Sequence, residues 1–146
     1  MGVAMEAAAE NGIEFIVLDR PNPIGGEKVE GNLVEDGYIS FVSQFKIPYI
    51  YGLTCGELAR MLVGEHMLAK DCKLTVVPMK HWKRSMDYTK TGLQWIPSSP
   101  HIPHPHSAYF YPLSGIRSMG LWNFLPYRRH ARRHARRVRA RTGPPN

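Results

Sequence analysis

The apolar run Phe15–Leu18 constrains the fold of this chain more than any other feature of the sequence. Four consecutive apolar residues without polar alternation are typical of a parallel strand that is buried on both faces. The run ends abruptly at Asp19, and residues 21–26 then contain two prolines and two glycines, which impose a rigid, exposed turn. We therefore predict a buried strand whose carboxyl end carries a constrained polar loop.

The surrounding segments predict an α/β fold. Residues 4–10 favour a helix that stops at an Asn-Gly pair, and residues 47–52 form a candidate second strand. Thr54, followed three residues later by Glu57, has the pattern of a capping box at the start of a further helix. Residues 72–79 supply a third strand. This order of elements indicates an α/β fold with a largely parallel sheet.

The polar residues after the first strand are candidates for a binding site. Asp19, Arg20 and Asn22 lie where ligands bind in open α/β sheets, outside the carboxyl ends of the strands. The alternative is structural, with Asp19 and Arg20 pairing with each other or capping neighbouring elements in a tight turn. Glu57 also follows a strand, but the capping box already explains it.

The loop-rich segment after residue 79 combines aromatic, hydroxyl and basic side chains that suit a sugar ligand. Aromatic rings stack on the apolar face of a sugar while polar groups bond its hydroxyls. The residues concerned are Trp82, Arg84, Trp95, Ser98, Ser99 and His101. The alternative is that both tryptophans belong to an ordinary core, and their spacing does not separate the two interpretations.

The sequence predicts no metal site and no cofactor. His101, His104 and His106 are separated by prolines, and no Asp, Glu or Cys nearby completes a ligand set. Cys55 and Cys72 have no metal-type spacing, and two buried free thiols are favoured over a disulfide.

The basic charge is concentrated at one end of the chain. The formal net charge is +7, and residues 127–146 hold eight arginines and no acidic residue. Residues 1–126 keep 11 basic and 12 acidic residues, a net charge of −1. We expect residues 117–146 to form a disordered basic tail able to bind polyanions non-specifically. No apolar run is long enough for a membrane span, no leader segment is evident, and the oligomeric state is not predicted.

Several motifs occur in the order found in one family. They are "LDRPNPIGG", "SFVSQFKIPYIYGLTCGELA", "MKHWKRS" and "WIPSSPHIPHPHSAYFYP", spread over residues 3–116. This part of the chain resembles the bacterial exo-β-N-acetylmuramidase family once catalogued as DUF1343 (NamZ-like). The resemblance implies that residues 1–116 form the central and C-terminal part of a Rossmann-like N-terminal domain. It also implies an exported, periplasmic enzyme of cell-wall recycling that hydrolyses terminal N-acetylmuramic acid from peptidoglycan fragments.

The resemblance assigns roles to the candidate residues. Asp19 would act as the second carboxylate of the reaction or as a hydrogen-bonding partner of the muramic sugar. Arg20 or Arg84 would bind the lactyl carboxylate of that sugar. The hydroxyl and N-acetyl groups would be contacted by Asn22, Ser98, Ser99 and His101, with stacking on Trp82 or Trp95.

The chain also departs from the family pattern. The "EHG" loop with the family's proposed catalytic glutamate has no counterpart, Tyr51 stands where His is frequent, and Ser43 where Gly is common. After residue 116 the sequence resembles nothing in the family. We therefore expect a truncated or frameshifted product with little or no activity. One alternative is a non-enzymatic, basic-tailed module that binds nucleic acid or anionic surfaces. Another is a remnant that does not fold, because missing strands leave a sheet edge exposed.

Overall fold

A computed structural model describes residues 1–41 and 43–112 of the chain. The contacts within the chain separate two units, Met1–Tyr109 and Phe110–Asn146, and all the elements described below lie in the first. The predicted basic tail lies outside the described residues, and the predicted boundary at residue 116 stays a prediction. Among the described residues, no helix has the length and apolar character needed to cross a membrane.

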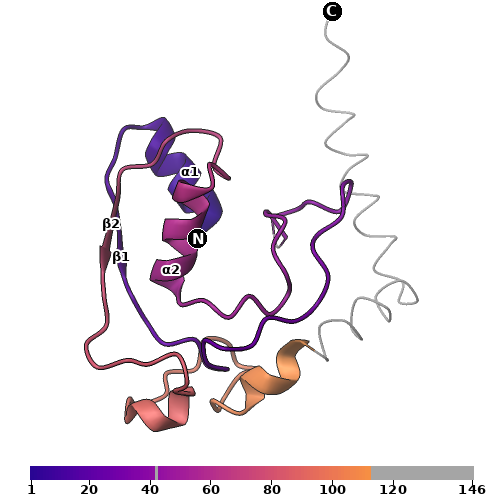
Figure 1. Cartoon of the computed structure of the whole chain (residues 1–146), viewed down its shortest axis with the longest axis vertical. Helices are drawn as coiled ribbons and strands as arrows, with labels where there is room; N and C mark the ends of the chain where they lie inside the picture. The colour runs from indigo at the N-terminus through magenta and orange to yellow at the C-terminus, as the bar shows by residue number, and fades with distance from the viewer. Residues whose placement is uncertain (42, 113–146) are drawn as a thin grey trace, which may run out of the picture. The chain divides into compact units, whose positions relative to one another are not determined.

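The first unit is built around a β-α-β arrangement. Strand β1 (Phe15–Leu18) pairs in parallel with strand β2 (Leu74–Val77), and helix α2 (Cys55–Gly64) lies between them in the sequence. Helix α1 (Gly2–Glu10) precedes β1, and a short 3-10 helix, η1 (Tyr88–Thr91), follows β2. Figure 1 shows α1 and α2 on the same side of the paired strands. The two predicted helices, the first and third predicted strands and their parallel pairing are confirmed.

Local sequence signals set the ends of both helices. Helix α1 ends at Glu10 with Asn11 as its C-cap, and Gly12 then adopts a φ of +66°, a left-handed conformation that glycine accepts without a steric penalty. Helix α2 begins at its N-cap Thr54, whose side chain accepts a hydrogen bond from the Glu57 amide. The Glu57 carboxylate in turn accepts one from the Thr54 amide. The predicted capping box is therefore confirmed.

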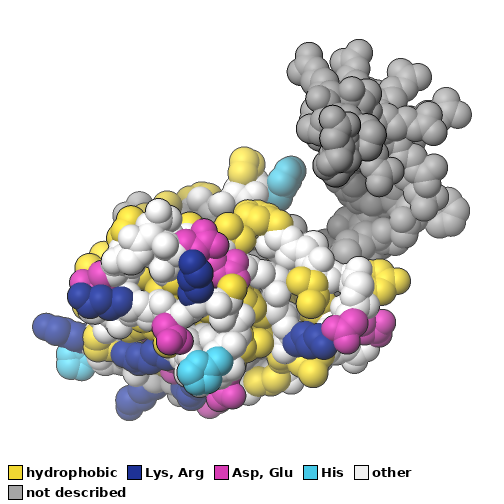
Figure 2. Space-filling view, turned by 90° about the horizontal axis from the view of Figure 1, so that it is seen from above, with side chains coloured by type: hydrophobic (Ala, Val, Ile, Leu, Met, Phe, Trp, Pro, Cys, Tyr) yellow, Lys and Arg dark blue, Asp and Glu magenta, His cyan; other side chains and the backbone are white. Residues whose placement is uncertain are grey.

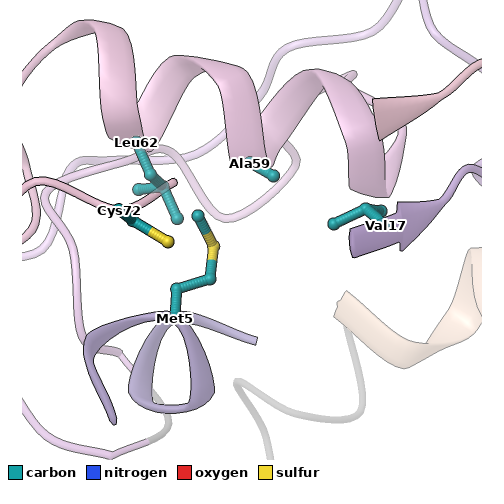
Figure 3. Packing of buried hydrophobic residues seen from close by; sticks show 5 residues of the cluster. All are labelled: Met5, Val17, Ala59, Leu62 and Cys72. Carbon is teal, nitrogen blue, oxygen red and sulfur yellow. The ribbon is translucent and has the colours of Figure 1, made fainter. Parts of the chain in front are cut away.

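One small hydrophobic core joins the two helices to the sheet. Its buried members come from α1, β1, α2 and the segment before β2, and they are Met5, Val17, Ala59, Leu62 and Cys72. Figure 3 shows the Met5 side chain extending from α1 towards Leu62 and Cys72. Met5 and Ala59 are 0% exposed and Leu62 is 1% exposed. Burial of these side chains fixes α2 across the sheet and places its first turn at the carboxyl ends of the strands.

The prediction that the first strand is buried on both faces is wrong for the described residues. Val17 faces the core, whereas Ile16 is 57% and Leu18 is 70% exposed. Val77 of β2, paired with Leu18, is 47% exposed. Both helices pack on the inner face, and no described segment buries the outer one. Figure 2 shows other hydrophobic side chains reaching the surface among charged groups of both signs.

The predicted strand at residues 47–52 is also wrong. The only ladder contact there is an antiparallel bridge between Ile50 and Glu30, with both backbone hydrogen bonds at 2.9 Å. Gly52 turns the chain away immediately afterwards with a φ of +61°. A single aligned residue pair cannot extend into a ladder when the chain turns so soon, so an apolar run forms a loop here.

Candidate functional site

The carboxylate of Asp19 anchors the end of β1 to the first turn of α2. Its Oδ1 accepts a hydrogen bond from the Gly56 amide at 2.7 Å, and its Oδ2 accepts one from the Thr54 hydroxyl at 2.9 Å. The Asp19 amide continues the sheet by donating to the Val77 carbonyl at 3.0 Å. A negative charge beside the N-terminal end of a helix is stabilised by the helix dipole. This geometry agrees with the structural alternative, in which Asp19 caps a neighbouring element.

Thr54 and Glu57 extend this contact from the helix towards the loop after β2. Thr54 is 0% exposed, so its hydroxyl is held between the Asp19 carboxylate and the Glu57 amide with no access to water. The second carboxylate oxygen of Glu57 forms an ion pair with Arg84, with Oε1 2.9 Å from Nη2. Glu57 therefore serves both as the helix cap and as the anchor for Arg84.

Arg84 also forms hydrogen bonds with two further loops at this edge of the sheet. Its Nη1 donates to the Gly26 carbonyl at 2.7 Å and to the Gly52 carbonyl at 3.0 Å. We call Asp19, Thr54, Glu57 and Arg84 the edge network. It joins the loop after β1, the loop before α2 and the loop after β2, all at the carboxyl edge of the parallel pair.

Asn22 holds the turn that follows Asp19. Its side-chain amide donates to the Leu53 carbonyl at 3.0 Å, and its Oδ1 accepts from the Ile24 amide at 3.2 Å. Both polar ends of Asn22 are therefore engaged within the protein, as expected of an Asx turn. Arg20 differs: its amide donates to Asp19 Oδ1 at 2.9 Å, while its exposed guanidinium forms no hydrogen bond or ion pair with the described residues.

Trp82 packs against the glycine-rich part of the same turn. A Cβ atom at Gly26 would lie 3.0 Å from Cη2 of the Trp82 ring and 3.3 Å from Cα of Arg84. Glycine therefore permits the close approach of Trp82 and Arg84, and a larger residue would force these neighbours to shift. The indole Nε1 of Trp82 is buried and has no hydrogen-bond partner among the described residues. His81, just before it, has a φ of +61°, an uncommon conformation for a residue with a side chain.

The remaining predicted site residues lie in a separate cluster. Trp95 packs edge-on against Tyr88, with ring centroids 4.8 Å apart and an interplanar angle of 89°, and its indole N–H donates to the Ile102 carbonyl at 3.2 Å. The Ser99 hydroxyl accepts from the His101 amide at 3.3 Å, and Ser98 is exposed. No hydrogen bond among the described residues joins these side chains to the edge network.

Cys55 lies at the first position of α2, beside Asp19 and Arg20. The prediction of two buried free thiols is confirmed for Cys72 and wrong for Cys55, which is exposed because the first helical position faces outward here. Partial burial of the Cys55 thiol is the largest cause that raises its pKa, and the Asp19 charge adds to it. The positive charges of the chain N-terminus and of Arg20 act in the opposite direction and lower this pKa. Burial also raises the pKa of Tyr51.

The described residues contain no group of three His, Cys, Asp or Glu side chains arranged to hold a metal ion.

Two features of the site were not predicted from the sequence. Arg84 was a predicted site residue, but its carbonyl acceptors were not predicted, because nothing in the sequence marks Gly26 and Gly52 as its neighbours. The helix η1 was not predicted either; its N-cap Asp87 accepts a hydrogen bond from the Lys90 amide at 3.2 Å. An Asp at this position before a polar run was the available signal.

Comparison with known protein families identifies the family of this chain. Residues 1–106 match the family model described as "Exo-beta-N-acetylmuramidase NamZ, N-terminal". The chain belongs to this family. The resemblance drawn from the motifs is therefore confirmed.

A curated relative of the NamZ family agrees with this assignment. The peptidoglycan beta-N-acetylmuramidase NamZ of Bacillus subtilis (strain 168) is 50% identical over 116 residues, which cover 80% of this chain and 28% of the relative. The chain thus spans less than a third of that NamZ protein's length.

Two solved structures support the fold. One DUF1343 family protein from Bacteroides fragilis NCTC 9343 is 81% identical, with a TM-score of 0.79 over 81% of this chain and 31% of that protein. A second from the same organism is 38% identical, with a TM-score of 0.66 over 74% of this chain and 30% of that protein. The predicted fold class, part of a Rossmann-like α/β domain, is confirmed.

Proposed function

We propose that this chain forms one wall of the sugar site of an exo-acting β-N-acetylmuramidase, which removes terminal N-acetylmuramic acid from peptidoglycan fragments. The observation that carries the proposal is the edge network, which fixes three loops at the carboxyl edge of the sheet in a NamZ-family chain. Ligands of open α/β sheets bind at that edge. An exported, periplasmic setting, where peptidoglycan lies, belongs to the same proposal.

The roles of the residues follow from which polar atoms remain available. Both carboxylate oxygens of Asp19 already accept hydrogen bonds from the protein, which favours a role in holding the site over proton transfer. Asn22 is engaged in the same way. Trp82 lines the turn after β1 and is our candidate for stacking on the sugar. Trp95, Ser98, Ser99 and His101 remain candidates for contacts with a larger peptidoglycan fragment.

The chain by itself is proposed to bind without efficient turnover. Glycoside hydrolysis normally needs one carboxyl group to protonate the leaving oxygen and a second as base or nucleophile. Asp19 is the single candidate at the described edge that sequence reasoning assigned to this chemistry, and it is committed to α2.

A turnover assay with a chromogenic N-acetylmuramide tests this proposal. The Bacillus subtilis relative, named a peptidoglycan beta-N-acetylmuramidase, is the positive control. We expect release by the relative and background release by this chain at equal concentration. Release by this chain at the relative's rate would contradict the proposed lack of efficient turnover.

A second candidate function rests on the sequence of the tail. The eight arginines at residues 127–146 favour non-specific binding to a polyanion such as nucleic acid. Binding of this kind weakens steeply as salt concentration rises, and it should vanish when residues 127–146 are deleted. Muramyl-sugar binding at the sheet edge should survive the deletion.

A further inference from the structure

We propose that Arg20, and not Arg84, is the residue that selects a carboxylate-bearing sugar at the edge of the sheet. The inference rests on the proposed function and assigns a specificity-determining role within it. Two guanidinium groups lie on the loops at this edge, and the described contacts distinguish them.

Arg84 is committed to the protein. Its Nη1 donates to the Gly26 and Gly52 carbonyls, and its Nη2 donates to Glu57 Oε1. Bidentate binding of a carboxylate requires two parallel N–H groups on one side of the guanidinium. Three of its five N–H groups are engaged in this way, and moving the guanidinium towards a ligand would break all three contacts. We therefore assign Arg84 to positioning the loops.

Arg20 has a fixed backbone and an unengaged side chain. Its amide is held by Asp19 Oδ1 at 2.9 Å, and the next residue, Pro21, is buried and restricts the chain. The carboxylate of the neighbouring residue, Asp19, accepts hydrogen bonds from Gly56 and Thr54 and forms no ion pair with Arg20. Within the described part of the chain, the Arg20 guanidinium therefore has no competing partner.

The backbone of Arg20 lies at the edge of the sheet where the site is proposed. Arg20 comes two residues after the end of β1, and its neighbour Asp19 accepts a hydrogen bond from the Gly56 amide in the first turn of α2. Muramic acid differs from glucosamine by a lactyl ether that carries a carboxylate. An unpaired guanidinium on a rigid loop is suited to distinguish these two sugars, because it can form charge-assisted hydrogen bonds with one and not the other.

The test compares N-acetylmuramic acid with N-acetylglucosamine as ligands of the full chain, using chemical-shift titration of backbone amides. We expect the wild type to bind N-acetylmuramic acid about tenfold more tightly, as one charge-assisted contact predicts. Arg20→Gln should reduce this preference to about onefold while leaving N-acetylglucosamine binding unchanged. The matched control is Arg60→Gln, which removes an exposed arginine on α2 and should keep the tenfold preference.

The outcomes separate this inference from the proposed function. Arg84→Gln should weaken both sugars alike, because it loosens the loops without removing the selecting charge. Loss of the preference in Arg84→Gln with its retention in Arg20→Gln would overturn the assignment. Equal binding of the two sugars by the wild type would refute the inference alone. Binding of neither sugar would refute the proposed function together with it. Circular dichroism melts of each variant identify any loss caused by unfolding.

Discussion

Replacing Asp19 with alanine removes the acceptor that joins the end of β1 to α2. The Gly56 amide and the Thr54 hydroxyl both lose a charged partner. Thr54 is 0% exposed, so its hydroxyl cannot exchange the lost contact for water. A buried polar group left without its partner costs about 1–3 kcal/mol. Allowing for solvent access to the partly exposed carboxylate, we expect Asp19→Ala to lower the free energy of unfolding by about 3 kcal/mol.

Urea unfolding followed by circular dichroism at 222 nm measures this loss. With a slope of about 1.5 kcal/mol/M, typical of a small protein, the midpoint should fall by roughly 2 M. Asp19→Asn is the matched variant, since its one oxygen replaces a single acceptor and should cost about half as much. An Asp19→Ala midpoint within about 0.3 M of the wild type would refute the anchoring role, because it corresponds to less than about 0.5 kcal/mol.

Two further predictions concern the glycines and the thiols. Gly52→Ala should destabilise the fold by about 2–4 kcal/mol, because φ at this position is +61° and the new Cβ would lie 2.6 Å from the Lys28 carbonyl oxygen. Gly64→Ala is the matched variant, because no atom lies within 4 Å of its new Cβ, and it should stabilise α2 by about 0.5–1 kcal/mol. Thermal melts of the two variants check this, and a shift in the same direction for both would contradict it. Cys55 should react with a disulfide reagent in the native state and Cys72 only on unfolding. Because burial and the Asp19 charge raise the pKa of Cys55 above the ordinary value of a thiol, its reaction rate should keep increasing with pH beyond the range in which a free thiol titrates. Asp19→Asn should speed the reaction at pH 8, because it removes a negative charge that raises this pKa. A slower reaction in Asp19→Asn would count against this account of the pKa.

Local signals in the sequence were sufficient for the elements that depend on neighbouring residues. The capping box at Thr54 and Glu57, the glycine stop after α1 and the apolar run Phe15–Leu18 each act over a few residues, and the structure contains all three. The parallel pairing followed from the presence of a helix between two strands.

The remaining features depend on contacts between distant parts of the chain. Arg84 meets the Gly26 carbonyl across 58 residues of sequence, and no local pattern specifies that pairing. Residues 47–52 have the composition of a strand, but strand formation requires a partner that continues beyond the single pair at Ile50. Burial on both faces of β1 likewise depends on what covers the sheet, which a run of apolar residues does not specify.

The central claim is that the loops held by the edge network line a muramyl-sugar site. The most direct measurement is a backbone-amide chemical-shift titration of the full chain with N-acetylmuramic acid. The account predicts shifts concentrated at residues 19–26, 52–54 and 82–84, with little change in α1. Shifts confined to residues 127–146, or no saturable shift in those three loops, would contradict it.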